Sequence, residues 1–307
     1  MRMRHHFPTK LVYAITLAAF LVGAGSATAQ DADDDPVSIG DSGAGYIDTA
    51  VIGNNVRFRY DAAYDSNKPN RGEFIWAWTP PSGNGPGRAE SRVDYQRFSS
   101  YVEWAPNDDF SVFVDAPLVL SNSTINDNTA GFGDLEAGFK VALCREPNTL
   151  VTFQMKGYFP TGDEKSGMGT GHVSLEPGLL FLHRQDWVTF EGELRHWISI
   201  DGTPNDQANV TRYGLGASSN LAPIGLPKIT PVVEVVGWSF LDGRVRYISA
   251  EGIDVREDSG GDTIVNLKIG SRYKLTECSD VYVGYGRALT GDRLYQDIFR
   301  LELRHKF

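Results

Sequence analysis

Three side chains that could act together in hydrolysis lie at alternate positions of one segment: His172, Ser174 and Glu176. A nucleophilic serine needs a base within about 2.6–3.2 Å, and a histidine oriented by a carboxylate is the common arrangement. Alternate residues of an extended strand are about 6.6 Å apart along the backbone. We therefore predict that these residues form no catalytic relay and interpret them as polar side chains on one face of a strand.

The remaining histidines and acidic runs suggest no other reaction. Two of the six histidines lie close to the first residue, and none has metal-ligand spacing. The runs GDEKSGMGTG and DADDD lack the ordered ligands of a calcium loop, so we interpret them as solvated segments. A lipase of the membrane surface needs serine and histidine on one face, whereas His196 and Ser199 lie on opposite faces. We expect no enzyme activity, no cofactor and no metal.

The charged residues belong to segments in which polar and apolar side chains alternate, as in β-strands. In GDLEAGFKVALC, Leu135, Phe139 and Val141 share one face, and Glu136 and Lys140 share the other. Strands that cross a membrane need about 9–11 residues, whereas the commonest strand length in globular proteins is about 5–6. Twelve segments have the longer length, at about 54–64, 92–104, 109–120, 132–144, 149–160, 171–183, 187–200, 209–221, 228–241, 262–274, 279–290 and 295–307.

The breaks between these segments alternate in length. Every second break is a tight turn such as APNDD, REPN, RQD or TECS, and most of the others are longer and rich in Gly, Asp and Asn. Outer-membrane barrels combine short turns at one end with longer loops at the other. We therefore predict an all-β fold, a transmembrane antiparallel up-and-down β-barrel of about 12 strands over residues 54–307. A soluble β-sandwich would also alternate, but it gives no reason for this sorting of loop lengths.

Three prolines fall inside predicted strands, where each removes a hydrogen-bond donor from the ladder: Pro117, Pro177 and Pro231. Bulges or bends would accommodate them. If they break strands instead, the predicted number of strands is too high by two.

The polar faces of the predicted strands would line the barrel lumen. Their charges have both signs, so we expect many cross-strand pairs. Twelve strands lie between an eight-stranded barrel filled by side chains and a sixteen-stranded one with an aqueous channel, which predicts a narrow polar path or a closed lumen. The candidate pore-lining residues are Arg57, Arg59, Asp61, Asp134, Glu136, Lys140, Lys156, Glu176, Glu191, Glu193, Arg195, Glu234, Lys268, Arg272, Arg300, Glu302 and Arg304.

The last segment, DIFRLELRHKF, alternates up to its terminal residue. Phe299, Leu301, Leu303 and Phe307 share a face opposite the charged residues. We predict that this face meets lipid and, with the terminal aromatic residue, forms the signal recognised by the outer-membrane barrel assembly machinery. Pairing with the first strand would fix this end of the chain.

The first residues have the pattern of an export signal. MRMRHHFPTK is basic, LVYAITLAAFLVGAG is apolar but short for a membrane anchor, and Ala27 and Ala29 fit a cleavage site. We predict a cleaved signal peptide over residues 1–29, a periplasmic N-terminal segment over 30–53, and a location in the outer membrane. The formal net charge of −10 argues against a nucleic-acid partner.

Two cysteines, Cys144 and Cys278, would remain in an oxidising compartment. The predicted strands place both at the periplasmic rim but across the barrel from one another. A disulfide needs Cα atoms within about 7 Å, so we expect free thiols rather than a bridge.

Several motifs within about residues 93–307 resemble a known family. The motifs are VFVDAPLVLS, GFGDLEAGFKVAL and GYFPTGDEKSGMGTGHVSLEPGLLF, with TPVVEVVGW and DVYVGYGRALTGD further on. Together they resemble the outer-membrane channel family named for the meta-pathway of phenol degradation. The resemblance implies a transporter-type barrel associated with aromatic compounds. It transfers no functional residue, because the motifs are spacings of strands and loops.

These observations predict passive uptake of small solutes, aromatic or other hydrophobic compounds among them. Selectivity would come from the lumen charges and from loops 65–91 and 242–261. The alternative is a closed structural or adhesive barrel that acts through its loops, where Trp76 and Trp78 would either enter the lumen or face a partner. The expected partners are outer-membrane lipid, the assembly machinery and a small solute.

Overall fold

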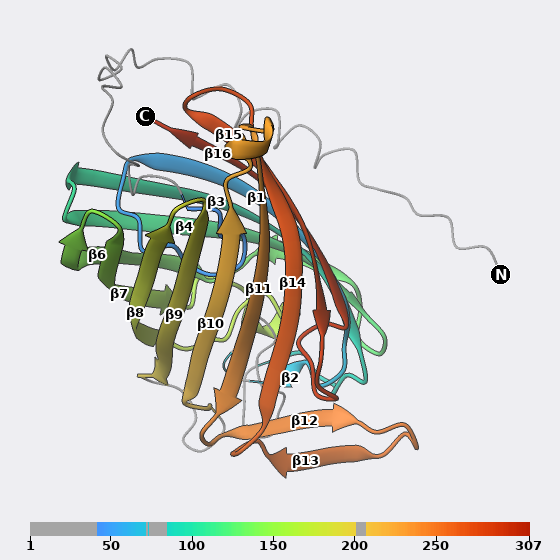
Figure 1. The fold of residues 1–307 in the computed structure, drawn as a ribbon. Helices are drawn as coiled ribbons and strands as arrows, with labels where there is room; N and C mark the ends of the chain where they lie inside the picture. Colours follow the sequence, from blue (N-terminus) through green and yellow to red (C-terminus); the bar gives the residue numbers. More distant parts are fainter. Residues whose placement is uncertain (1–41, 72, 74–84, 201–206) are drawn as a thin grey trace. The chain divides into compact units, whose positions relative to one another are not determined.

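Twelve antiparallel strands close into a barrel, which confirms the predicted fold class (Figure 1). The computed structural model describes residues 42–71, 73, 85–200 and 207–307. The first strand closes the barrel because it pairs with the last strand on one side and with the second on the other. The barrel strands are β1 Asn55–Ser66, β3 Val93–Asn107, β4 Phe110–Ser123, β6 Leu135–Glu146, β7 Thr149–Phe159, β8 Ser174–Gln185, β9 Val188–Ser199, β10 Val210–Ser219, β11 Ile229–Phe240, β14 Thr263–Lys274, β15 Ser279–Ala288 and β16 Asp297–Lys306.

Shorter elements lie between the barrel strands. Strand β5 (Thr129–Phe132) pairs antiparallel with the last part of β4, while β12 (Arg244–Ile248) pairs with β2 (Asn70–Arg71) and β13 (Asp254–Asp258) in a separate small sheet. Two short 3₁₀ helices, η1 (Glu164–Ser166) and η2 (Ala222–Ile224), lie in connections. No helix in the described part of the chain is long and apolar enough to cross a membrane.

The two ends of the barrel differ in their connections. Short turns join β3 to β4, β6 to β7, β8 to β9 and β14 to β15, and a longer connection with η2 joins β10 to β11 at the same end, which we call the turn end. The longer connections, with β2, β5, β12 and β13, form the opposite end, which we call the loop end. The predicted sorting of breaks by length therefore holds except for β10–β11, whose connection is longer than the one between β15 and β16 at the loop end.

Alternation along each strand separates the two faces of the barrel wall. Charged side chains turn inward and are buried, whereas large apolar side chains turn outward and are exposed. The outward set is Val102, Val112, Val114, Leu179, Phe181, Phe190, Leu194, Leu215, Val233, Val235, Leu267, Ile269, Val283, Phe299, Leu301 and Leu303. An exposed apolar surface of this extent is typical of contact with lipid or with another protein.

The three prolines do not reduce the number of strands. At Pro117, β4 changes its partner from β6 to β5, and the Pro117 carbonyl accepts from the Gly133 N–H at 2.9 Å. Pro177 lies in a short unpaired stretch between β8 and β9, which keep the same register on both sides. Pro231 lies just outside the paired region of β10 and β11. Each proline therefore occupies a position where the missing N–H leaves no partner unsatisfied.

The segment before β1 lies inside the barrel rather than in the predicted periplasmic position. Residues 42–53, blue in Figure 1, form backbone hydrogen bonds with side chains of the inner wall. This position differs from the prediction because the backbone of the segment finds its partners in the lumen. Residues 30–41, the predicted signal peptide 1–29, and Trp76 and Trp78 lie outside the described residues.

Candidate functional site

None of the seventeen candidate pore-lining side chains is exposed to solvent. Twelve are buried, and the other five, Arg57, Arg59, Asp134, Lys156 and Arg300, border an internal cavity. The side chains form ion pairs within the lumen, including Arg59–Glu302 at 2.8 Å and Arg195–Glu176 at 2.9 Å. Buried charges are tolerated when they are paired and hydrogen-bonded in this way.

Three wall carboxylates hold the internal segment by its backbone N–H groups. Glu191 accepts from Gly43 and Ala44 at 3.1 Å each. Glu234 accepts from Tyr46 and Ile47 at 2.9 Å and from Gly45 at 3.2 Å, and Glu193 accepts from Asp48 at 2.9 Å. Six successive N–H groups thus point at carboxylates, and bonds of this kind to a charged acceptor are stronger than neutral ones.

Wall cations hold the carbonyl groups of the same segment. The Arg272 guanidinium donates to the carbonyl of Ala44 at 2.6 Å, and Arg212 donates to that of Tyr46 at 2.9 Å. Further donors to this backbone are Arg300, Arg304, Lys140 and Thr152. The segment is therefore recognised mainly through its main chain, with Asp48 as the one charged side chain that it contributes among the described residues.

Two glycines allow the segment to approach the wall this closely. A Cβ on Gly45 would lie 2.1 Å from the ring of Tyr282, which is itself fully buried. A Cβ on Gly43 would lie 2.4 Å from the hydroxyl of Ser218. Any larger residue at these positions would collide with the wall.

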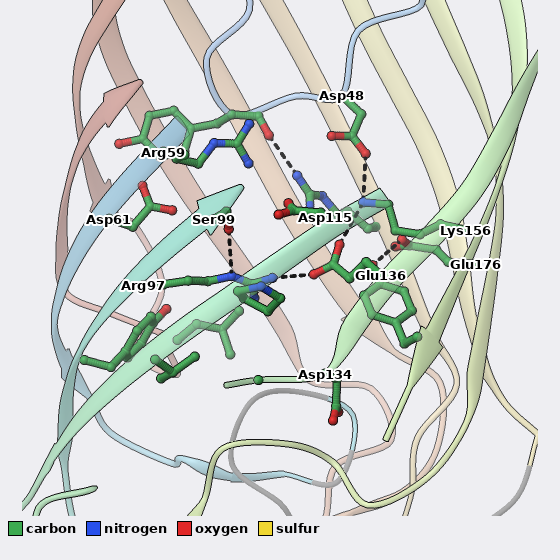
Figure 2. A pocket seen from close by; sticks show the side chains of 18 of the residues that line it. Asp48, Arg59, Asp61, Arg97, Ser99, Asp115, Asp134, Glu136, Lys156 and Glu176 are labelled. Atoms are coloured by element: carbon green, nitrogen blue, oxygen red, sulfur yellow. Dashed lines mark hydrogen bonds and ion pairs between the residues drawn. The ribbon is translucent and has the colours of Figure 1, made fainter. Parts of the chain in front are cut away.

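A cavity of about 270 Å³ lies between this segment and the loop end, and we call it the chamber. Tyr46, Asp48 and Thr49 of the segment border it, as do loop residues such as Met168 and Tyr295. Strands β1, β3 and β4 contribute more lining residues than any other strand, and the wall includes aromatic rings as well as charged groups (Figure 2). The lining aromatic residues are Tyr46, Tyr95, Tyr101, Phe113, Tyr158, Trp197, Trp238 and Tyr295.

Ion pairs connect the charged residues around the chamber. Arg97 pairs with Glu136, whose other oxygen lies 3.3 Å from Lys156 (Figure 2). Lys156 also pairs with Asp48 of the internal segment at 3.2 Å. Burial raises the pKa of the Tyr295 hydroxyl, which lies in the loop that covers the chamber. The chamber therefore combines apolar ring faces with a network of neutralised charges.

A second cavity of about 280 Å³ opens at the turn end. Ser42 and Gly43 border it, and no described residue lines both cavities. Its basic side chains outnumber its acidic ones, and Asp280 there pairs with both Arg272 and Arg304. The internal segment thus contributes to the boundary of each cavity.

The C-terminal strand has the orientation expected from its sequence. Phe299, Leu301 and Leu303 are exposed on the outer face of β16, and Phe307 is also exposed. Their neighbours Arg300, Glu302 and Arg304 turn inward to ion pairs. Recognition by an assembly machinery stays a prediction.

The predicted separation of His172 and Ser174 is wrong. Ser174 Oγ lies 3.0 Å from His172 Nδ1, and Ser199 Oγ lies 3.2 Å from the same nitrogen. Strand β8 begins only at Ser174, so the chain bends at His172 and the distance along a regular strand does not apply. Both His172 and Ser174 are fully buried and border neither cavity. The contact therefore gives a substrate no access to the serine.

Metal-ligand side chains, the two thiols and one buried carboxylic acid are the remaining candidates for chemistry among the described residues. In the described ranges, no three His, Cys, Asp or Glu side chains are grouped to bind a metal ion. Cys144 and Cys278 are free and exposed. Burial raises the pKa of Glu73, near the loop end, to about 7.

Sequence reasoning missed several residues of the lumen. Arg97 and Asp115 border the chamber, Glu103 pairs with Lys140 and Arg57, and Arg212 contacts the internal segment. Each lies on the inward face of its strand, so period-two alternation in β3, β4 and β10 could have identified all four. The internal segment itself has no such signal.

No protein-family model and no curated protein sequence matches the chain. Solved structures share its fold. An outer membrane channel from Pseudomonas putida F1 is 13% identical with a TM-score of 0.55, over 89% of this chain and 100% of that one. The NanC porin is 12% identical with a TM-score of 0.51, over 83% of this chain and 100% of that one. At these identities the likeness establishes the barrel fold.

Proposed function

We propose that the chain is an outer-membrane channel for passive uptake of small solutes. The observation that carries this proposal is a closed barrel with an exposed apolar outer face and internal cavities at both ends of its lumen. The two structures of similar fold, a channel and a porin, support it. In this arrangement the loop end faces outward, the turn end faces the periplasm, and residues 1–29 are the export signal.

The chamber favours solutes that carry an apolar ring. Aromatic faces contribute much of its wall, and its cations other than Lys268 are already paired with carboxylates among the described residues. Aromatic or other hydrophobic compounds fit this lining, in line with the motif resemblance. Charged residues of the lumen would set the ion selectivity of the residual path.

The second candidate is a closed structural or adhesive barrel. The six N–H groups held by Glu191, Glu193 and Glu234 favour it, because they fix the internal segment across the lumen. In that case the loop end, with the sheet of β2, β12 and β13, would be the working surface.

Single-channel recording separates the two candidates. Residues 30–307 are refolded in detergent, checked for heat-modifiable migration and inserted into a planar bilayer. We expect stable current steps whose ion selectivity shifts toward cations in Arg97→Gln, since Arg97 borders the chamber and the variant removes one positive charge from it. The matched control is Arg287→Gln, because Arg287 is exposed on the outer side of β15. A folded barrel that stays silent, also without residues 30–50, would refute transport and favour the closed barrel.

A further inference from the structure

One charged side chain that borders the chamber, that of Asp115, has no hydrogen-bond or ion-pair partner among the described residues. Among the described residues, fifteen charged side chains border this cavity, and all but Asp115 make a hydrogen bond or an ion pair with a defined group. Asp115 is only 7% exposed, and its Oδ1 has no hydrogen-bond partner. Figure 2 shows its carboxylate between the Arg97–Glu136 pair and Asp48 without a bond to either. Buried acceptors of this kind are rare and call for an explanation.

The strand register explains why no neighbour neutralises Asp115. It lies directly opposite Glu136 on β6 and Tyr101 on β3. Like charges at facing positions are unfavourable. Glu136 takes both nearby cations, Arg97 and Lys156, while the Tyr101 hydroxyl donates to Glu103 at 2.7 Å. Oδ1 itself is closed off from solvent, so the chamber meets this carboxylate at Oδ2, which accepts no hydrogen bond from the described residues.

The surroundings of Asp115 select among solutes by charge. An anion would meet this carboxylate, and the cations of the chamber other than Lys268 are already paired with carboxylates among the described residues. A cation would come close to Arg59, Arg97 and Lys156, which border the same cavity. A neutral hydroxyl group avoids both costs, because it donates a single hydrogen bond to Oδ2 of the Asp115 carboxylate.

We infer that the chamber binds neutral solutes in which a hydroxyl group is attached to an apolar ring, with Asp115 as the residue that accepts from the hydroxyl. The ring of Tyr101, which lies opposite Asp115, and the ring of Phe113, two residues before it on β4, border the same cavity and provide apolar contact. This inference rests on the proposed function, since it assigns the chamber a place on the solute path. A site built to accept from a hydroxyl discriminates strongly against an analogue that lacks it.

Equilibrium binding tests the inference without requiring conduction. The probes are cyclohexanol and methoxycyclohexane, which share a ring, although only the alcohol has an O–H donor. Trp197 and Trp238 border the chamber, so their fluorescence reports occupancy, and neither probe absorbs with them. We expect the refolded chain to bind the alcohol about tenfold more tightly than the ether, as for a hydrogen bond to a charged acceptor.

Variants at Asp115 decide the assignment. Asp115→Ala should bind the two probes equally, and Asp115→Asn should keep part of the preference because its amide oxygen still accepts. The control is Asp127→Ala, an exposed loop residue that borders neither cavity and should keep the full preference. Heat-modifiable migration shows whether each variant folds. If Asp115→Ala does not fold, the reduced preference expected of Asp115→Asn tests the assignment instead.

Two results would overturn the inference: equal binding of alcohol and ether by the unmodified chain, or an unchanged preference in Asp115→Ala. If such a chain still forms channels, only the role of Asp115 is refuted. If the preference is present but the barrel never conducts, the inferred binding site holds and the proposed transport function fails.

Discussion

Replacing Gly45 with valine should release the internal segment from the lumen. A Cβ at this position would lie 2.1 Å from one carbon of the Tyr282 ring and 2.5 Å from two others. Carbon atoms in contact are normally about 3.5–4.0 Å apart. Tyr282 is fully buried, so its ring cannot move aside by the required distance. Gly45→Val and a seated segment are therefore incompatible.

The size of the effect follows from what the segment loses. A hydrogen bond to a charged group contributes about 1.5–3 kcal/mol, so the six N–H groups held by Glu191, Glu193 and Glu234 represent on the order of 10 kcal/mol before the released segment is hydrated. In the unmodified chain this keeps the segment seated almost all the time. The valine overlap cannot be relieved without giving up the bonds on both sides of residue 45.

The assay is single-channel conductance in a planar bilayer. Gly45→Val should conduct as well as a variant without residues 30–50, and both should exceed the unmodified chain. Gly53→Ala is the matched control, because a Cβ at Gly53 has nothing within 4 Å. Adding Tyr282→Ala to Gly45→Val makes room for the valine and should return the conductance toward that of the unmodified chain.

Two outcomes would refute this reasoning. The first is a folded Gly45→Val barrel with unchanged conductance, which would mean that the segment does not limit the current. The second is an equal increase in Gly53→Ala, which would trace the effect to the loss of a glycine in general rather than to the contact with Tyr282.

Two further predictions concern the loop end and the cysteines. Burial raises the pKa of Glu73 to about 7, above its usual value of 4.5, so its contribution to stability is present below about pH 4.5 and is lost as the pH rises to 7. The loss of stability is on the order of 3 kcal/mol. Hydrogen exchange of the loop that contains Glu73 should therefore show more opening at pH 8 than at pH 4.5, and Glu73→Gln should show no such difference. Cys144 and Cys278 are free and exposed, so a maleimide should label two thiols in the folded, unreduced chain and one in Cys144→Ser. An unlabelled chain would contradict this.

The barrel and the direction of its charged side chains could be predicted because both follow from a single period. Polar and apolar side chains alternate along each strand, and a register slip of one residue would turn every apolar residue to the wrong face. The lengths of the breaks indicate which connections lie at the same end of the barrel. Arg59, Glu193 and Glu302 could thus be placed inward from their position in the alternation alone. Their partners could not, because cross-barrel distances depend on strand tilt and stagger, which the sequence does not state.

The internal segment could not be predicted because its contacts use the main chain. SGAGYID begins with four small residues and has no periodic pattern, and nothing in these residues indicates which carboxylates accept from their N–H groups. Glu191 and Glu234 therefore suggested cross-strand ion pairs, whereas they bind the backbone of residues 43–47. At His172 the error was different, since a regular strand was assumed where the chain bends.

The distribution of contacts around the barrel shows where a solute would meet resistance. Residues 42–48 are held by β9, β10, β11, β14 and β16, and Tyr46 and Asp48 of this stretch border the chamber. The cavity at the turn end includes Ser42 and Gly43 and shares no described lining residue with the chamber. A solute that passes from one to the other must therefore cross the line of residues 42–48. Loosening this part of the segment, rather than widening the chamber, is the change that should most increase the current.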